Sequence, residues 1–348
     1  MKAGRTLQQL AVELARQQKA KRDFIVGTRS MCMSEMAECF RLLPESEPEM
    51  TFRMSDLFHR QLGSALGIPA KYYDKMQAEH PALLAQNVNG WFEKTPAKHT
   101  VRTLDGTARA FLSDRYRRID NFEIAQATLP IIGKMPDAQV ESCEVTETRM
   151  YIKMVNPRLE AEVQKGDIVQ AGIVISNSEV GLGSVQVCPL VYRLVCLNGM
   201  IVNDLGQRKY HIGRENEEAW ELYSDATLQA DDEVFMRKLG DIVRTAIDEA
   251  RFAKVVDKLR EAAEVKISGP VPEVVELTSR EFGFTKNEQT GILQHLIEGG
   301  DLSLYGLSNA VTRASQNAPD YDRATALEGL GWQIAVMPRE AWAAVNGV

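Results

Sequence analysis

Five arginines crowd one short segment of a 348-residue chain whose formal net charge is −7. They are Arg102, Arg109, Arg115, Arg117 and Arg118. Phe111 and Tyr116 lie among them. Guanidinium groups bind phosphates, and aromatic rings stack on the unpaired bases of a single strand. The segment therefore predicts a surface for nucleic acid or another polyanion.

The residues around the first two arginines are predicted to form a tight β-hairpin. Two alternating runs, HTVRTL and TARAFL, are joined by Asp105-Gly106, a dipeptide favoured in two-residue hairpin turns. Counting back from this turn, Arg102 should face Arg109 across the ladder, with Phe111 on the same face. Like charges in such positions destabilise a sheet unless a carboxylate or an outside anion lies between them.

Internal ion pairing is the competing interpretation of the arginines. Four carboxylates are close enough in sequence to pair with them, namely Asp105, Asp114, Asp120 and Glu123. We favour the nucleic-acid surface and extend it to a lysine before the hairpin and to two residues of a later strand. The predicted contact residues are Lys98, Arg102, Arg109, Phe111, Arg115, Tyr116, Arg117, Arg118, Tyr192 and Arg193.

Three regions are predicted to hold this segment. Residues 1–95 show apolar side chains at helical spacing and are expected to be an N-terminal helical region. Residues 96–265 contain the hairpin, further predicted strands and then long helices, and residues 266–348 form a C-terminal helical unit. Several strands without intervening helices indicate an antiparallel sheet. The predicted fold class is α+β, with a central antiparallel sheet, and the three regions can form one continuous domain.

Local signals predict several helix ends. Ser55 and Thr285 are expected N-caps, and Gly299-Gly300 should end the helix that follows Thr285. The helical pattern of residues 216–264 is too long for one ordinary helix and predicts a break near Gln229–Asp232. Residues 57–76 also have the form of a helix-turn-helix, for which DNA reading and plain packing are alternative interpretations.

The sequence contains no motif for a cofactor, a metal or a known catalytic centre. A GxSxG elbow, a phosphate-binding loop and a dinucleotide fingerprint are all missing, and the five cysteines and five histidines have no metal-ligand spacing. We expect no enzyme, cofactor or bound metal, although the carboxylates leave a metal-dependent nuclease open. Without a signal peptide or an apolar run near 18 residues, we expect a cytoplasmic protein with no membrane partner.

Charge is distributed unevenly along the chain. Residues 1–30 carry seven basic and two acidic side chains, whereas residues 215–264 carry fourteen acidic and seven basic ones. An acidic helical segment is usually a solvated face. It also suggests the alternative function, a non-enzymatic protein that binds or inhibits a host DNA-processing or defence factor through its acidic helices.

Four separated stretches carry a family resemblance. They are LGIPAKYYDKM (66–76), RAFLSDRYRRIDN (109–121), VYRLVCLNGM (191–200) and LYGLSNAVTRASQNAPDYDRATALEGLG (304–331). Together they resemble the phage/plasmid-like protein family known as domain of unknown function 932. The resemblance implies a role in a mobile genetic element, and the family's recurring RxFLSDRY pattern covers residues 109–116.

The order of elements is also similar to that of phage single-strand annealing proteins. In those proteins a sheet and a helix form a basic groove in an oligomeric ring. This analogy rests on element order alone. It makes single-stranded DNA the favoured partner, in recombination or replication, and suggests a homo-oligomer.

Overall fold

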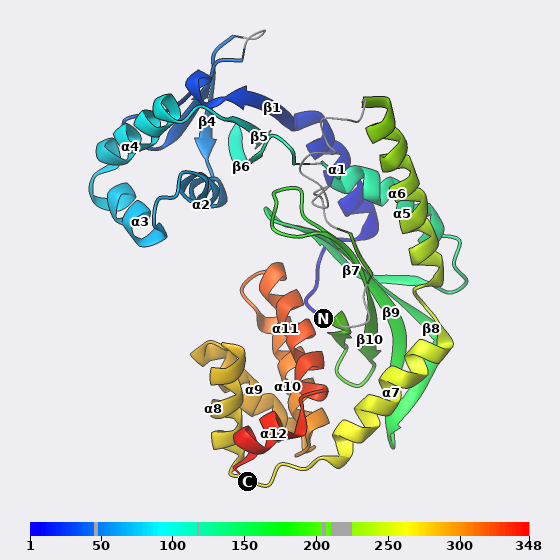
Figure 1. Ribbon diagram of the computed structural model, residues 1–348. Helices are drawn as coiled ribbons and strands as arrows, with labels where there is room; N and C mark the ends of the chain where they lie inside the picture. The colour runs from blue at the N-terminus through cyan, green and yellow to red at the C-terminus, as the bar shows by residue number, and fades with distance from the viewer. Residues whose placement is uncertain (45–47, 117, 204–206, 210–224, 348) are drawn as a thin grey trace.

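The computed structural model describes the chain apart from residues 45–47, 117, 204–206, 210–224 and 348. Two β-sheets with helices packed around them make up the described part, which confirms the predicted α+β class (Figure 1). None of the described helices is long and apolar enough to cross a bilayer.

The first sheet contains the predicted hairpin and four strands that we did not predict. Its strands are β1 (Arg22–Gly27), β2 (Met31–Met33), β3 (Cys39–Leu42), β4 (Met50–Met54), β5 (Lys98–Leu104) and β6 (Thr107–Ser113). Their order is β1-β5-β6-β4-β3-β2, antiparallel except for the β4–β6 pair. The purely helical prediction for residues 1–95 is therefore wrong. Strands of three to six residues are too short for their alternation to be distinguished from helical spacing.

Three helices cover one face of the first sheet. They are α2 (Asp56–Ala65), α3 (Ala70–Glu79) and α4 (Pro81–Lys94). The predicted cap of α2 is confirmed, because the Ser55 hydroxyl accepts a hydrogen bond from the Phe58 amide at 3.1 Å. A Cβ atom at Gly63 would lie 2.8 Å from the Tyr73 ring, so this glycine lets α2 and α3 pack closely. That contact supports the packing interpretation of residues 57–76.

The second, central sheet is antiparallel, as predicted. Its strands are β7 (Gln139–Val145), β8 (Met150–Gln164), β9 (Asp167–Asn177), β10 (Val185–Arg193), β11 (Asn198–Ile201) and β12 (Gln207–Lys209). The order is β11-β10-β9-β8-β7, and β12 pairs with β10. Apolar side chains of one face pack against three helices, α1 (Leu7–Ala20), α5 (Asn121–Ile132) and α6 (Asp225–Thr245) (Figure 1).

The remaining helices form a unit around Trp332 and Tyr305, which are each 1% exposed. They are α7 (Glu249–Glu264), α8 (Val271–Phe282), α9 (Lys286–Gly299), α10 (Leu304–Ala314), α11 (Tyr321–Ala335) and α12 (Arg339–Asn346). The predicted cap at Thr285 and the end of α9 at Gly299 are confirmed.

The break in the long helical stretch lies between α6 and α7, not near Gln229–Asp232. The Asp248 side chain accepts a hydrogen bond from the Arg251 amide at 2.8 Å and caps the new helix. Aspartates inside a helix, such as those at 231 and 232, resemble a capping signal in sequence, but here they continue α6. Residues 216–224 of the predicted stretch lie outside the described residues.

Candidate functional site

A β-bulge at Arg109 changes the register of the hairpin. The turn is as predicted, with positive φ angles of 50° at Asp105 and 75° at Gly106. The ladder, however, pairs Arg102 with Ala110 and leaves Arg109 without a residue opposite it. The predicted apposition of Arg102 and Arg109 is therefore wrong. A bulge adds one residue to one strand and redirects a side chain, here away from the other arginine.

The same bulge places Phe111 on the core face. Phe111 pairs with Val101, is 3% exposed, and lies 5.6 to 6.4 Å, between ring centroids, from Phe40, Phe58 and Phe92. The extra residue reverses the alternation of every later side chain on the strand. The prediction that Phe111 stacks on a base is wrong, because its ring is part of the core.

Arg102 is fully buried, and carboxylates of its own chain pair with it. Its Nε and Nη2 donate to the two carboxylate oxygens of Asp23 at 2.9 and 3.0 Å. Nη2 also donates to Asp120 at 2.7 Å, and Nη1 donates to the Glu179 carbonyl at 2.8 Å. With 0% exposure, Arg102 has no surface left for a phosphate. The internal-pairing interpretation therefore holds for this arginine, and the predicted contact is wrong.

Arg109 also has an internal partner, since its Nη2 lies 2.5 Å from the Glu179 carboxylate. Lys21 lies 2.5 Å from Asp120 and 3.6 Å from Glu179. Three buried or nearly buried cations thus meet three carboxylates, so their charges balance. We call this set the ion-pair network: Lys21, Asp23, Arg102, Arg109, Asp120 and Glu179. It joins the first sheet to the start of α5 and to the loop after β9.

The other predicted aromatic contacts are also buried. The Tyr116 hydroxyl donates to the Ser178 carbonyl at 3.3 Å, and burial raises the pKa of Tyr116 to about 12. Tyr192 is 7% exposed within an apolar cluster of the central sheet. Arg193 donates to Asp167 at 2.7 Å. Neither tyrosine is accessible for stacking, and Arg193 is part of an internal pair, so these predictions need the same correction.

Three predicted contact residues remain exposed. Lys98 and Arg115 are exposed, and Arg118 is 53% exposed while pairing with Asp23 at 3.1 Å. Arg117 lies outside the described residues. The described arginines of the segment thus fall into a buried set that joins the two sheets and an exposed set.

The pKa of Asp120 lies below its usual range. Burial raises the pKa, but the neighbouring Arg102 and Lys21 lower it by a larger amount together. The folded state therefore stabilises the charged carboxylate. This stabilisation is complete above the pKa of an unfolded aspartate, near 3.9, and is lost as the pH falls through the lower folded value.

We expect Asp120→Asn to lower the free energy of unfolding by about 2 kcal/mol at pH 7, because the variant leaves Arg102 and Lys21 partly unpaired. Asparagine also caps helices, so the start of α5 should persist. Urea denaturation of both proteins from pH 7 to pH 3 measures the difference, which should shrink below about pH 4. A difference that stays constant over this range would contradict the assigned charge of Asp120.

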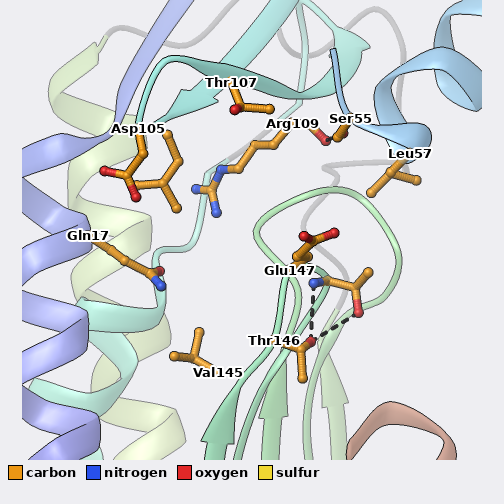
Figure 2. A pocket seen from close by; sticks show the side chains of 11 residues that line it. Gln17, Ser55, Leu57, Asp105, Thr107, Arg109, Val145, Thr146 and Glu147 are labelled. Carbon is orange, nitrogen blue, oxygen red and sulfur yellow. Dashed lines mark hydrogen bonds between the residues drawn. The ribbon is translucent and has the colours of Figure 1, made fainter. Parts of the chain in front are cut away.

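A cavity of about 300 Å³ lies beside Arg109. Its walls come from four places: α1, the start of α2, the tip of the β5–β6 hairpin and the turn between β7 and β8. The lining residues are Gln17, Ser55, Leu57, Leu104, Asp105, Thr107, Arg109, Val145, Thr146, Glu147 and Thr148. Figure 2 shows Arg109 reaching into this space from the hairpin, with Gln17 and Glu147 on other walls.

Tertiary hydrogen bonds hold two of these walls. The Ser55 amide donates to the Ala108 carbonyl at 3.0 Å, and its hydroxyl donates to the Arg109 carbonyl at 3.3 Å. On the other side, Thr146 donates to Asp322 of α11 at 3.1 Å. The start of α2 is thereby fastened to the bulge, and the β7–β8 turn to the C-terminal helices.

A group of exposed side chains lies at the other end of the hairpin, away from its turn. There β5 begins beside the end of β1 and the end of β6. Lys98 begins β5, whereas Arg29 and Arg115 each lie two residues beyond a strand end. The Thr28 hydroxyl donates to the Phe92 carbonyl at 3.0 Å and so holds the end of α4 at the same place.

We call this group the basal patch: Arg29, Trp91, Lys94, Lys98 and Arg115. All five side chains are exposed, and Trp91 is 41% exposed. The Lys94 amine lies 5.3 Å from the Trp91 ring centroid. Glu93 and Asp114 are the carboxylates of the same segments, so four cations face two anions.

Sequence reasoning missed Arg29, Trp91 and Lys94. A signal was present, because residues 1–118 contain 19 lysines and arginines against 13 aspartates and glutamates, a net charge of +6. With −7 for the whole chain, residues 119–348 carry −13. The excess of basic residues therefore lies in the part of the chain that contains the first sheet and its helices.

In the described part of the chain, no three histidine, cysteine, aspartate or glutamate side chains are grouped so that they could hold a metal ion. All five cysteines are free thiols.

A family model described as domain of unknown function (DUF932) matches residues 109–317, which is more than half of the chain. The match starts at the bulged arginine and extends through the central sheet into α10 and the short turn after it. No curated protein and no solved structure matches the chain.

Proposed function

The chain belongs to the family described as domain of unknown function (DUF932), a description that names no activity, so we propose a function from the arrangement of the side chains: the protein binds nucleic acid through the basal patch. Four exposed cations beside one exposed tryptophan are the observation that carries this proposal. The site replaces the arginine pair of the hairpin, whose guanidinium groups have internal partners.

Single-stranded nucleic acid fits the patch best. Lysine and arginine attract the phosphates and release counterions, whereas an exposed aromatic ring offers a face for an unpaired base. Trp91 is the exposed ring here, and Lys94 lies against it. The net charge of +6 over residues 1–118 adds attraction at longer range.

A role in a phage or plasmid, suggested by the family resemblance, is part of the same proposal, and recombination or replication is suggested by the similar element order of phage single-strand annealing proteins. Binding or annealing of single strands is the activity that we favour, and a homo-oligomer is compatible with it.

The alternative function, capture of a host protein by the acidic helices, has less support. Within the described residues of α6 and α7, several carboxylates pair with a basic side chain three or four positions away. These pairs are Glu233–Arg237, Asp241–Arg244 and Asp257–Arg260. Pairing of this kind leaves fewer free negative charges for a partner that normally binds nucleic acid.

Fluorescence anisotropy tests the proposal with labelled single- and double-stranded oligonucleotides at two salt concentrations. The wild-type protein should bind the single strand more tightly, and its affinity should fall steeply with salt. The triple variant Lys94→Ala/Lys98→Ala/Arg115→Ala should lose about tenfold or more in affinity, and the slope of log K against log salt should become shallower by about 2. Trp91→Ala should weaken single-strand binding by about 1–3 kcal/mol.

A matched triple variant, Arg60→Ala/Lys71→Ala/Lys75→Ala, removes three exposed charges from α2 and α3 instead. Its affinity should stay near that of the wild type. Loss of binding in this variant alone would assign the contact to the candidate helix-turn-helix. A flat salt dependence of the wild-type protein, or co-purification with a host protein without any oligonucleotide binding, would reject the basal patch.

A further inference from the structure

We propose that the cavity beside Arg109 binds a small, singly charged organic anion, with either a carboxylate or a phosphodiester group on Arg109. This site is separate from the basal patch, because the cavity lies at the turn end of the hairpin and the patch at its opposite end. The inference therefore stands or fails independently of nucleic-acid binding.

The Arg109 side chain faces the cavity, and not all of its N–H groups have a hydrogen-bond acceptor. Its side chain is 12% exposed and donates from Nη2 to Glu179. The Nε atom is buried and has no hydrogen-bond partner among the described residues. A buried donor without an acceptor costs about 1–3 kcal/mol. The bulge turns the side chain toward the cavity, and its exposed part can bind an anionic oxygen there.

The charges around the cavity limit the ligand to one negative charge. Arg109 is the single cation among the described residues that line it, and Glu179 already offsets part of its charge. Two carboxylates line the same space. Asp105 pairs with Arg16 at 2.9 Å, whereas Glu147 is exposed with no ion-pair partner in the described part of the chain. A dianion would be repelled by Glu147, so a monoanion is favoured.

The remaining residues that line the cavity suit a ligand whose uncharged part is partly apolar. Leu57, Leu104 and Val145 offer apolar surface, and Thr107 and Gln17 add polar groups near it. A volume of about 300 Å³ lies at the small end of ligand sites. Figure 2 shows Gln17, Thr107 and Val145 on different sides of the guanidinium of Arg109.

Isothermal titration calorimetry of the full chain with two matched probe pairs tests the inference. The first pair is 3′,5′-cyclic AMP, a phosphodiester monoanion, and AMP, its doubly charged counterpart. The second pair is hippurate, a carboxylate, and neutral hippuramide. At least one monoanion should bind with a Kd at least tenfold below that of its matched partner, and the pair that responds identifies the anionic group.

Variants locate the site. Leu57→Trp fills the cavity while leaving every residue of the ion-pair network unchanged, and should abolish binding. Leu104→Trp fills the cavity from the hairpin if the first variant does not fold. Leu83→Trp, at an exposed position of α4, is the control and should bind as the wild type does. Arg109→Lys retains the charge but removes the fork of donors, and should weaken binding at least tenfold.

Three results would each overturn the inference. They are the failure of both monoanions to bind at about 1 mM, equal affinity for cyclic AMP and AMP together with equal affinity for hippurate and hippuramide, and unchanged binding in both cavity-filling variants.

Discussion

Arg102→Met should lower the free energy of unfolding by about 3–5 kcal/mol, because it leaves two buried carboxylates without their main partner. The guanidinium of Arg102 donates hydrogen bonds to the carboxylates of Asp23 and Asp120, at 2.9 and 2.7 Å. The carbonyl of Glu179 would lose its hydrogen bond as well. Urea denaturation followed by circular dichroism measures the loss.

Two further variants make this result specific. Arg102→Lys should restore only part of the stability, since an ammonium group cannot reproduce the planar fork of donors that meets Asp23 at two oxygens. Arg115→Met, at an exposed position of the same segment, should change stability by no more than about 0.5 kcal/mol. Equal effects of Arg102→Met and Arg115→Met would show that Arg102 is not the structural arginine described above.

Lys153→Met should also destabilise the protein by about 3–5 kcal/mol, in a different part of the molecule. Lys153 of β8 lies 2.6 Å from Glu328 of α11, and both side chains are 0% exposed. The ammonium also donates to Thr325 at 3.0 Å and lies 4.5 Å from the Tyr321 ring centroid. Removing it leaves a negative charge buried between the central sheet and the C-terminal helices.

The double variant Lys153→Met/Glu328→Leu should recover most of this loss, because apolar side chains of similar volume often replace a buried ion pair at little cost. Thermal or urea unfolding of the wild type, both single variants and the double variant completes the cycle. A coupling of at least about 2 kcal/mol is expected. Additive effects of the two substitutions would contradict a direct pair.

Features encoded by neighbouring residues could be predicted from sequence. The Asp105-Gly106 turn needs positive φ at both positions, and Thr285 with Glu288 forms a capping box within four residues. The long strands β8 and β9 contain enough apolar and β-branched residues to be recognised as strands. In each of these cases the physical cause lies within a few positions of the structure that it produces.

The bulge could not be predicted, and it determines the site. Nothing in TARAFL marks Arg109 as the unpaired residue, because the register depends on what each side chain meets in the fold. Phe111 packs in the aromatic core, while Arg109 forms an ion pair with Glu179. A single extra residue satisfies both, and every assignment beyond it changes face.

The partners of the arginines were only partly visible in sequence. Asp120 was among the carboxylates considered, but Asp23 and Glu179 lie more than 70 residues from Arg102. The Asp23–Arg102 pair depends on the pairing of β1 with β5, and the contact with Glu179 depends on how the loop after β9 packs against the first sheet. The exposed basal patch was missed for the same reason, since Arg29 and Arg115 come close to Lys98 only through strand pairing.

Hydrogen exchange with and without a single-stranded oligonucleotide tests most directly whether the basal patch, and not the buried arginines, holds the strand. Mass spectrometry of the full chain at low salt resolves peptides over residues 91–98 and 100–111. We predict that the oligonucleotide protects the first peptide and leaves exchange in the second unchanged. Protection confined to residues 100–111 would contradict this account and return the binding site to the hairpin arginines.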